Sequence, residues 1–169
     1  MERMGRDEAP DDPRASKADL ADALEAALDA RAAESYVVDE GVTAKYAMLT
    51  RWSMEPESYL SNKGGCLGYG LPATVGAAIA EREQADPREV VGYVADGSYL
   101  YYPHAVYTAV REDLDLTVVV PDNRNYRILA DNAAALLGGE GDDYEWDSIR
   151  FDPPVDIPAN AESHGARGD

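Results

Sequence analysis

Apolar residues along this chain alternate between helical spacing and short unbroken runs. Leu20, Leu24 and Leu28 repeat on one face of a helix, and Ser16 stands where an N-cap would lie. The run SYVVDE, residues 35–40, follows and is typical of a short buried strand. The pattern therefore predicts a helix that begins near Ser16 and is followed by a strand.

The same alternation continues through the middle of the chain. The predicted elements are, in order, a short helix over residues 41–52, a glycine-dense loop over 61–70, a small-residue helix over 71–83, a strand over 89–94, a helix over 104–112 and a strand over 116–120. Both of these strand runs, EVVGYV and LTVVV, are almost wholly apolar, as in parallel strands covered on both faces. The sequence thus predicts an α/β fold, a doubly wound parallel sheet with helices on both faces.

The two ends of the chain are less regular. After the last strand run the pattern predicts a helix over 127–137, an acidic surface loop over 138–148 and a last helix from residue 157 or 158. We expect a final strand and helix of such a sheet to be missing, so that the fold is incomplete at its C-terminus. Residues 1–15 are charged and lack an apolar period, which predicts a flexible acidic linker or tail before one domain over 16–169.

Composition narrows the class of protein. The net charge of −18 disfavours binding to nucleic acid or to an anionic membrane surface. Because only three of the 15 basic residues are lysines, the acidic surface favours a salt-adapted, halophilic organism over an ordinary acidic protein. One cysteine and two histidines exclude an internal disulfide and a histidine-rich metal cage. The sequence has no apolar leader and no long apolar run, so we expect a cytoplasmic protein.

Polar residues follow two of the predicted strands. Asp96, Gly97 and Ser98 come directly after EVVGYV, and Asp122 and Asn123 follow LTVVV. Because the carboxyl ends of neighbouring parallel strands meet at one edge of a sheet, we expect Asp96 and Asn123 to lie close together. Their oxygens suit Mg²⁺, and Gly97 and Ser98 offer N–H groups and a hydroxyl to an anion, which together indicate a diphosphate. The alternative is that both tips are ordinary turns, since these residue types dominate loops.

The two tips together resemble the cofactor signature of thiamine-diphosphate enzymes, in which Gly-Asp-Gly-Ser is followed, after a helix and a strand, by Asn-Asn. The segment NKGGCLGYGLPATVGAAIA, residues 62–80, is similar to the family's Gly-Gly-Leu-Gly-Phe-Ala-Leu-Pro-Ala segment. The resemblance covers roughly residues 16–168. It points to the C-terminal diphosphate-binding domain of the benzoylformate decarboxylase and acetolactate synthase superfamily, and it implies thiamine diphosphate and Mg²⁺ as cofactors.

The resemblance also implies a role for each matching residue at the metal. Asp96, the side chain of Asn123 and the main-chain carbonyl of Asn125 would bind Mg²⁺. The sequence departs from the family pattern at Asp122, which replaces the first Asn of the Asn-Asn pair. The second Asn, which ligates the metal in the family, is intact, and the added carboxylate is expected to change ion affinity.

Other matching residues would hold the organic part of the cofactor. By the resemblance, Gly97, Ser98 and Tyr126 would hold the diphosphate, and Thr43 lies in a region that often adds a hydroxyl to it. Ala95 replaces the first Gly of Gly-Asp-Gly-Ser, which is a mild change where the φ angle is negative.

The glycine-dense loop is implied to contact the cofactor rings. Leu67 matches the bulky residue that wedges the cofactor into its bent conformation, and Gly65 matches the position whose main-chain carbonyl meets the aminopyrimidine ring. Cys66 replaces a Gly of the family segment, which is tolerated only if this backbone position does not require a positive φ.

Turnover in the family also needs a glutamate that touches the aminopyrimidine ring and belongs to a separate pyrimidine-binding domain. No segment of this chain resembles that domain. Glu40 falls in the diphosphate-binding domain and is not assigned that role. We therefore expect no catalytic residue in this chain and no activity of the chain alone.

The resemblance implies a thiamine-diphosphate and Mg²⁺ module of a 2-oxo-acid decarboxylase or an acetolactate-synthase-like enzyme. Such a module would work with a pyrimidine-binding domain or subunit, in a homo- or hetero-oligomer, on a 2-oxo acid. The chain would then be a fragment of a larger enzyme or one subunit of a two-chain enzyme. The alternative is a catalytically inactive remnant, or an interaction subunit, that keeps only the fold.

Overall fold

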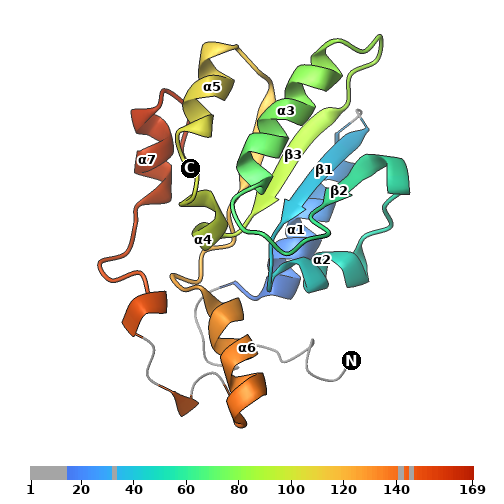
Figure 1. Cartoon of the computed structure of the whole chain (residues 1–169). Helices are drawn as coiled ribbons and strands as arrows, with labels where there is room; N and C mark the ends of the chain where they lie inside the picture. The colour runs from blue at the N-terminus through green and yellow to red at the C-terminus, as the bar shows by residue number, and fades with distance from the viewer. Residues whose placement is uncertain (1–14, 32–33, 141–142, 145–146) are drawn as a thin grey trace.

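A parallel sheet forms the centre of the molecule (Figure 1). The structure is a computed structural model that describes residues 15–31, 34–140, 143–144 and 147–169. Within these residues the strands are β1 (Ser35–Glu40), β2 (Tyr59–Ser61), β3 (Glu89–Val94) and β4 (Leu116–Val119), in the order β2-β1-β3-β4 with every pair parallel. The predicted α/β fold with a parallel sheet is therefore confirmed.

Helices cover both faces of this sheet. The helices are α1 (Lys17–Asp29), α2 (Lys45–Arg51), α3 (Gly70–Arg82), α4 (Asp96–Tyr99), α5 (Ala105–Arg111), α6 (Arg127–Leu137) and α7 (Ile157–Ser163), with short 3₁₀ turns η2 (Pro56–Ser58) and η4 (Asp147–Ile149). Helices α1 and α2 pack on one face, and α3, α5 and α7 pack on the other. Helix α6 lies beyond the carboxyl ends of the strands (Figure 1). None of the described helices combines the length and apolarity needed to cross a bilayer.

The first helix begins where its sequence predicts. Ser16 Oγ accepts a hydrogen bond from the Asp19 N–H at 3.0 Å, and the Asp19 carboxylate accepts one from the Ser16 N–H at 3.3 Å. This reciprocal pair satisfies N–H groups that the first turn of a helix leaves without partners. The predicted linker over residues 1–15 lies almost wholly outside the described residues, and its flexibility stays a prediction.

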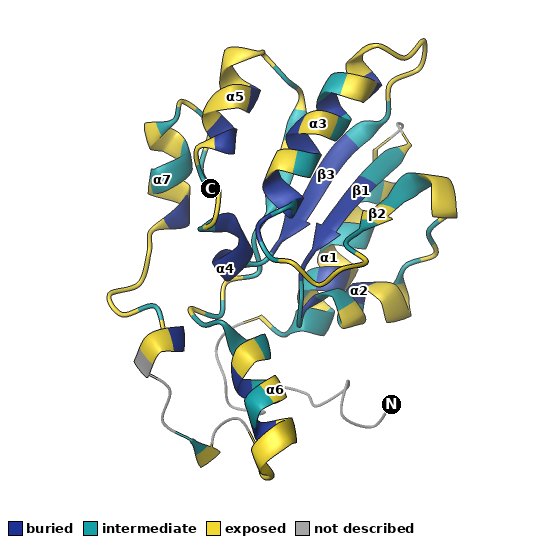
Figure 2. Ribbon diagram, viewed as in Figure 1, coloured by how far each residue is buried: buried dark blue, intermediate teal, exposed yellow. Residues whose placement is uncertain are grey.

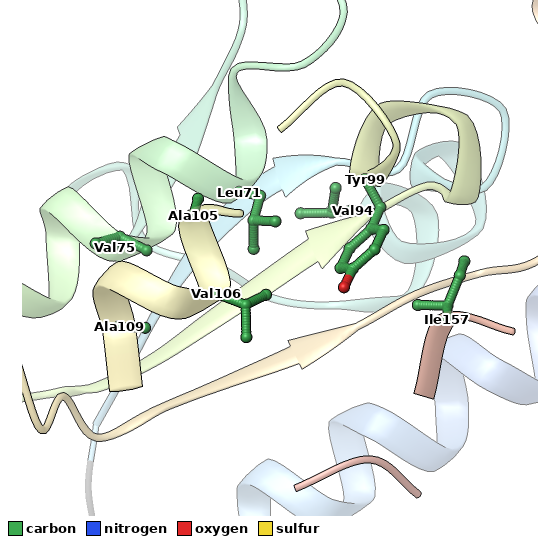
Figure 3. Close-up of a cluster of buried hydrophobic side chains, with 8 residues drawn as sticks. All are labelled: Leu71, Val75, Val94, Tyr99, Ala105, Val106, Ala109 and Ile157. Carbon is green, nitrogen blue, oxygen red and sulfur yellow. The ribbon is translucent and has the colours of Figure 1, made fainter. Parts of the chain in front are cut away.

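Two apolar clusters hold the layers together, and Figure 2 shows the strands β1 and β3 buried between them. On one face, Met48 and Tyr93 are fully buried with Ala21 of α1. On the other face, Tyr99 clusters with side chains of α3, β3, α5 and α7, and in Figure 3 its ring lies between Val94 and Ile157. The Tyr99 hydroxyl donates to Asn160 Oδ1 at 2.8 Å, which ties α7 to the body of the domain.

One local prediction was wrong, and two short elements were not predicted. The helix predicted over residues 41–52 is confined to α2, because residues 41–44 form a turn in which Val42 has a φ of 51°. Strand β2 was not predicted, since three residues are too few to show a period of two. The short helix α4, which follows β3 directly, was also not predicted, since four residues are too few to show a helical period.

The outer edge of β4 pairs with no described strand. Leu116, Val118 and Val119 are only half-buried there, and a groove of about 620 Å³ runs between β4, α5 and α7. The expected lack of a further strand on this edge stays a prediction, as do the limits of the domain.

We predict that Gly92→Ala destabilises the fold while Gly76→Ala does not. A Cβ on Gly92 would lie 2.5 Å from Thr74 Oγ1, and this hydroxyl is held by the Gly70 carbonyl at 2.7 Å. The expected cost is about 1–3 kcal/mol of unfolding free energy. Gly76 lies in α3 with no atom within 4 Å of an added Cβ, so alanine there should stabilise by about 0.5–1 kcal/mol. Urea unfolding measures both, and equal effects would contradict the packing described here.

Candidate functional site

The carboxylate of Asp96 joins the ends of β3 and β4. Asp96 is 1% exposed. Its Oδ1 accepts a hydrogen bond from the Gly97 N–H at 2.9 Å, and its Oδ2 accepts from the N–H groups of Asn123 at 3.2 Å and Asn125 at 3.3 Å. The prediction that Asp96 and Asn123 lie close together is thus confirmed. Oδ1, which accepts one N–H group, keeps capacity for a further partner, whereas two N–H groups occupy Oδ2.

A turn after β4 presents the two asparagines to this carboxylate. Arg124, between them, has a φ of 56°, and its N–H donates to Asp122 Oδ1 at 2.8 Å. The Arg124 carbonyl accepts from the Phe151 N–H, and the Tyr126 N–H donates to the Ile149 carbonyl, both at 2.9 Å. These bonds leave the main-chain carbonyl of Asn125 outside the pairing, which keeps it available as a ligand.

Three buried oxygens around Asp96 have no hydrogen-bond partner. They are Asn123 Oδ1, Asn125 Oδ1 and Ser98 Oγ. Buried polar atoms in folded proteins nearly always have a partner, and each exception calls for an explanation. Asp96 stands among them with two carboxylate oxygens. Such a set of hard oxygen atoms fits a small divalent cation and the phosphate oxygens that accompany it.

The surroundings of Asp96 disfavour its charged form. Burial, together with the nearby Asp122 carboxylate, raises the pKa of the Asp96 carboxyl to about 6, although the Gly97 and Asn125 N–H groups oppose the shift. The added carboxylate expected from the sequence therefore does act on Asp96. No group of three or more His, Cys, Asp or Glu side chains gathers anywhere in the described part of the chain, so a metal here would depend on amide and carbonyl oxygens as well.

A small hollow opens beside this carboxylate. Its lining residues are Val42, Thr43, Leu67, Ala95, Asp96, Gly97, Ser98, Asn123, Asn125, Tyr126, Arg127 and Ile128. The floor is tight, because a Cβ on Gly97 would lie 2.5 Å from the Tyr126 ring. The structure thus brings eight of the nine predicted site residues together around one hollow. Gly65 is the exception, since it is exposed and lies two residues before Leu67 in the loop.

The turn after β1 lines the same hollow and contains a strained residue. Val42 has a φ of 51°, which is unusual for a β-branched residue. Strained backbone of this kind clusters at functional sites. The turn places Thr43 on the wall of the hollow, where the sequence predicted a hydroxyl.

The glycine-dense loop is fixed from both sides. Asn62 Oδ1 accepts the N–H groups of Gly64 at 2.6 Å and Gly65 at 3.1 Å, and the Asn62 amide donates to the Cys66 carbonyl. On the far side, the Gly68 and Gly70 N–H groups donate to Glu40. Between these supports, Leu67 lines the hollow.

The substitutions in the family pattern fit the backbone. Ala95 has a φ of −59°, so no glycine is needed there. Cys66 is not among the residues with a positive φ, whereas Gly65 and Gly68 have φ angles of 70° and 94°. Neither Ala95 nor Cys66 therefore requires a positive φ, which is the condition under which these substitutions were expected to be tolerated.

Sequence reasoning missed several residues at this site. Val42, Arg127 and Ile128 line the hollow without having been singled out. Arg127 directly follows Tyr126, and its side chain also donates to Asp131 at 2.9 Å. The positive φ of Val42 leaves no sequence signal. Arg127, by contrast, could have been predicted, because a basic residue next to Tyr126 stands beside the expected diphosphate site.

A family model described as "Thiamine pyrophosphate enzyme, C-terminal TPP binding domain" matches residues 39–169. The match spans most of the chain, and the chain therefore belongs to this family of thiamine diphosphate-binding domains. The resemblance noted in the sequence is confirmed.

Relatives with described activities agree with this assignment. The IlvX protein of Mycobacterium tuberculosis, described as an acetolactate synthase large subunit, is 38% identical over 110 residues, which are 64% of this chain and 20% of that protein. Benzoylformate decarboxylase of Pseudomonas aeruginosa is 34% identical over 97 residues, which are 57% of this chain and 18% of that protein. The chain therefore spans about a fifth of the length of these relatives.

Solved structures give the same result. Benzoylformate decarboxylase of Polynucleobacter necessarius has a TM-score of 0.80 at 25% identity, over 98% of this chain and 30% of that chain. The thiamine diphosphate-dependent 4-hydroxybenzoylformate decarboxylase of Rhodococcus jostii RHA1 has a TM-score of 0.75 at 26% identity, over 96% of this chain and 29% of that chain.

We predict that acid stabilises the metal-free chain relative to Asp96→Asn. The folded-state pKa of Asp96, about 6, lies above the ordinary value of 3.8. Its contribution to stability is therefore fully present below pH 3.8 and is lost as the pH rises through about 6. Between pH 7.5 and 4 the wild type should gain on the order of 1–3 kcal/mol over the variant. Urea unfolding across this range, with chelator present, measures the difference, and a constant difference would contradict the prediction.

Proposed function

We propose that this chain binds thiamine diphosphate together with Mg²⁺ in the hollow beside Asp96. The observation that carries the proposal is the set of unpartnered buried oxygens of Asn123 and Asn125 around the Asp96 carboxylate. Asp96, the Asn123 side chain and the Asn125 main-chain carbonyl would hold the metal. This set fits Mg²⁺, which prefers oxygen ligands and keeps positions for phosphate oxygens and water.

The remaining lining residues fit the two ends of the cofactor. Gly97, Ser98 and Tyr126 would hold the diphosphate, where the buried Ser98 hydroxyl lacks any other partner, and Thr43 would add a second hydroxyl. Leu67 would support the bent cofactor beneath its rings. Gly65 would offer its main-chain carbonyl to the aminopyrimidine from outside the hollow.

When bound, thiamine diphosphate supplies a ring that accepts the electrons released from a 2-oxo acid on loss of CO₂. The residues of this chain would bind and orient the diphosphate, and Leu67 would exclude water beneath the rings. Glu40, the carboxylate nearest the loop, is occupied by two backbone N–H groups and so does not serve as the activating glutamate.

We infer that the activating glutamate comes from a pyrimidine-binding domain or subunit, so that turnover requires an oligomer. The names of the relatives favour a 2-oxo-acid decarboxylase or an acetolactate-synthase-like enzyme as the whole protein. The net charge of −18 favours work in a salt-rich cytoplasm, where counter-ions screen the repulsion among carboxylates.

We predict that thiamine diphosphate raises the melting temperature of the chain only when Mg²⁺ is present. At a cofactor concentration of about 100 times Kd, a ligand that binds only the folded state adds about 2.7 kcal/mol, which for a domain of this size raises Tm by about 5–10 °C. A thermal melt in molar KCl, with and without each component, measures the shift. Asp96→Ala should abolish it.

Asp86→Ala provides the matched control, since Asp86 is an exposed acid in the turn before β3. This variant should keep the full cofactor shift, which separates loss of a ligand from loss of one negative charge. A chain that melts cooperatively but shows no shift, even when mixed with a pyrimidine-domain protein, would identify a remnant that keeps only the fold.

A further inference from the structure

Glu40 is a buried carboxylate whose two oxygens both hold the glycine-dense loop. It is the last residue of β1 and is 5% exposed. Its Oε1 accepts the Gly68 N–H at 2.6 Å, and its Oε2 accepts the Gly70 N–H at 2.5 Å. These partners lie 28 and 30 residues further along the chain. The carboxylate therefore fixes the point where the loop enters α3.

The loop passes over this carboxylate at a distance that only glycines permit. A Cβ on Gly70 would lie 2.6 Å from the Glu40 Cβ. Gly68 has a φ of 94°, and a Cβ there would lie 2.5 Å from Tyr101 Cβ. Because Gly68 and Gly70 are held this close to Glu40 and Tyr101, the backbone has little freedom here. The residue just before Gly68 is therefore also fixed in position.

That residue is Leu67. On its other side the loop is held by Asn62, through Gly64, Gly65 and Cys66. In the described part of the chain, no backbone-to-backbone hydrogen bond holds residues 62–68. The position of Leu67 over the hollow therefore depends on side chains, with Asn62 holding the loop before it and Glu40 holding the loop after it. The Tyr69 hydroxyl adds a further support, since it donates to the Asp39 main-chain carbonyl at 2.6 Å.

Keeping an ionised carboxylate at this place is costly. Burial raises the pKa of Glu40, and the N–H groups of Gly70, Gly68 and Tyr69 oppose the shift. The Ser98 hydroxyl lies close enough to favour the charged form slightly, although its Oγ completes no hydrogen bond. A neutral side chain would avoid the burial cost but would offer fewer acceptors to the two N–H groups.

We propose that Glu40 is a positioning residue that presets Leu67 to receive the ring portion of a thiamine diphosphate. The proposal rests on the proposed function. Glu40 is hydrogen-bonded to none of the metal ligands, and among the diphosphate residues only the Ser98 hydroxyl lies near it. Its main effect should therefore reach the cofactor through the loop, so that Glu40 controls affinity for the rings more than affinity for the diphosphate.

Two probes separate these parts of the ligand: Mg²⁺ with inorganic pyrophosphate, and Mg²⁺ with thiamine diphosphate. Isothermal titration of the full chain gives both dissociation constants. Glu40→Gln, which keeps one acceptor and loses the other, should weaken thiamine diphosphate about tenfold and change pyrophosphate less than twofold. If Glu40→Gln does not fold, Glu40→Asp, which keeps the charge on a shorter stem, carries the same comparison.

The control is Asp39→Asn, at the neighbouring buried carboxylate of β1. The Asp39 carboxylate accepts from the Tyr59 hydroxyl at 2.6 Å, the Ser61 hydroxyl at 3.2 Å and the Gly41 N–H at 2.8 Å, and from no residue over 62–70. The Tyr69 hydroxyl donates to the main-chain carbonyl of Asp39, which the substitution leaves in place. It should leave the ratio of the two dissociation constants unchanged. If it shifts that ratio as Glu40→Gln does, the effect is general destabilisation and the proposal is wrong.

A double-mutant cycle tests whether Glu40 acts through Leu67. Leu67→Ala alone should weaken thiamine diphosphate selectively, and Glu40→Gln should then add less than twofold. Additive losses, or equal losses for both probes, would overturn the proposal.

Amide exchange of Gly68 and Gly70 gives a readout that needs no ligand. Both amides should exchange at least about tenfold faster in Glu40→Gln than in the wild type. Unchanged exchange would overturn the proposal directly. If exchange accelerates but the wild type binds neither probe, the hold of Glu40 on the loop stands, while the proposed function and the role toward the cofactor both fail.

Discussion

The parallel alignment of β1, β3 and β4 is the constraint on which the site depends. In register, Val38 of β1 lies opposite Gly92 of β3, and Gly92 lies opposite Val118 of β4. The strands therefore end near the same level, and polar residues that follow an apolar run converge at one edge. Glu40 and Asp96 stand at this edge, and both are held by backbone N–H groups in place of a cation. Because the backbone sets their positions, the geometry of the site follows from the sheet.

The same edge collects features that lower the stability of the domain. Asn123 and Asn125 keep buried oxygens without partners, Val42 has a positive φ, and burial raises the pKa of Asp96 to about 6. Each feature has an energetic cost, and none is explained by packing. Under the proposed function, a ligand that supplies positive charge and gives partners to these oxygens would remove part of that cost. Folding and ligand binding would then be linked, and the two apolar clusters, which lie elsewhere, stabilise the fold without the ligand.

Sequence periodicity was enough to predict the layers but not the fine structure of the loops. The apolar runs of β1, β3 and β4 and the residues after them predicted both the sheet and the meeting of Asp96 with Asn123. Strand β2 was missed because three residues show no period, and the turn at Val42 was missed because a β-branched residue gives no sign of a positive φ. The hold of Glu40 on the loop was invisible for another reason. Its partners are backbone N–H groups 28 and 30 residues away, which no side-chain pattern records.

Under the proposed function, the two ends of the cofactor meet very different surroundings. The diphosphate end would lie among buried or half-buried groups that this chain supplies alone, with Asp96 and Ser98 each 2% exposed or less. The ring end would rest on a loop whose residues 63–66 are exposed and whose Leu67 is only half-buried. Rings held on one side by such a loop remain open to water on the other side. A second domain that covers this side would exclude water and would also bring the missing glutamate. One domain contact would therefore meet both of these requirements for turnover.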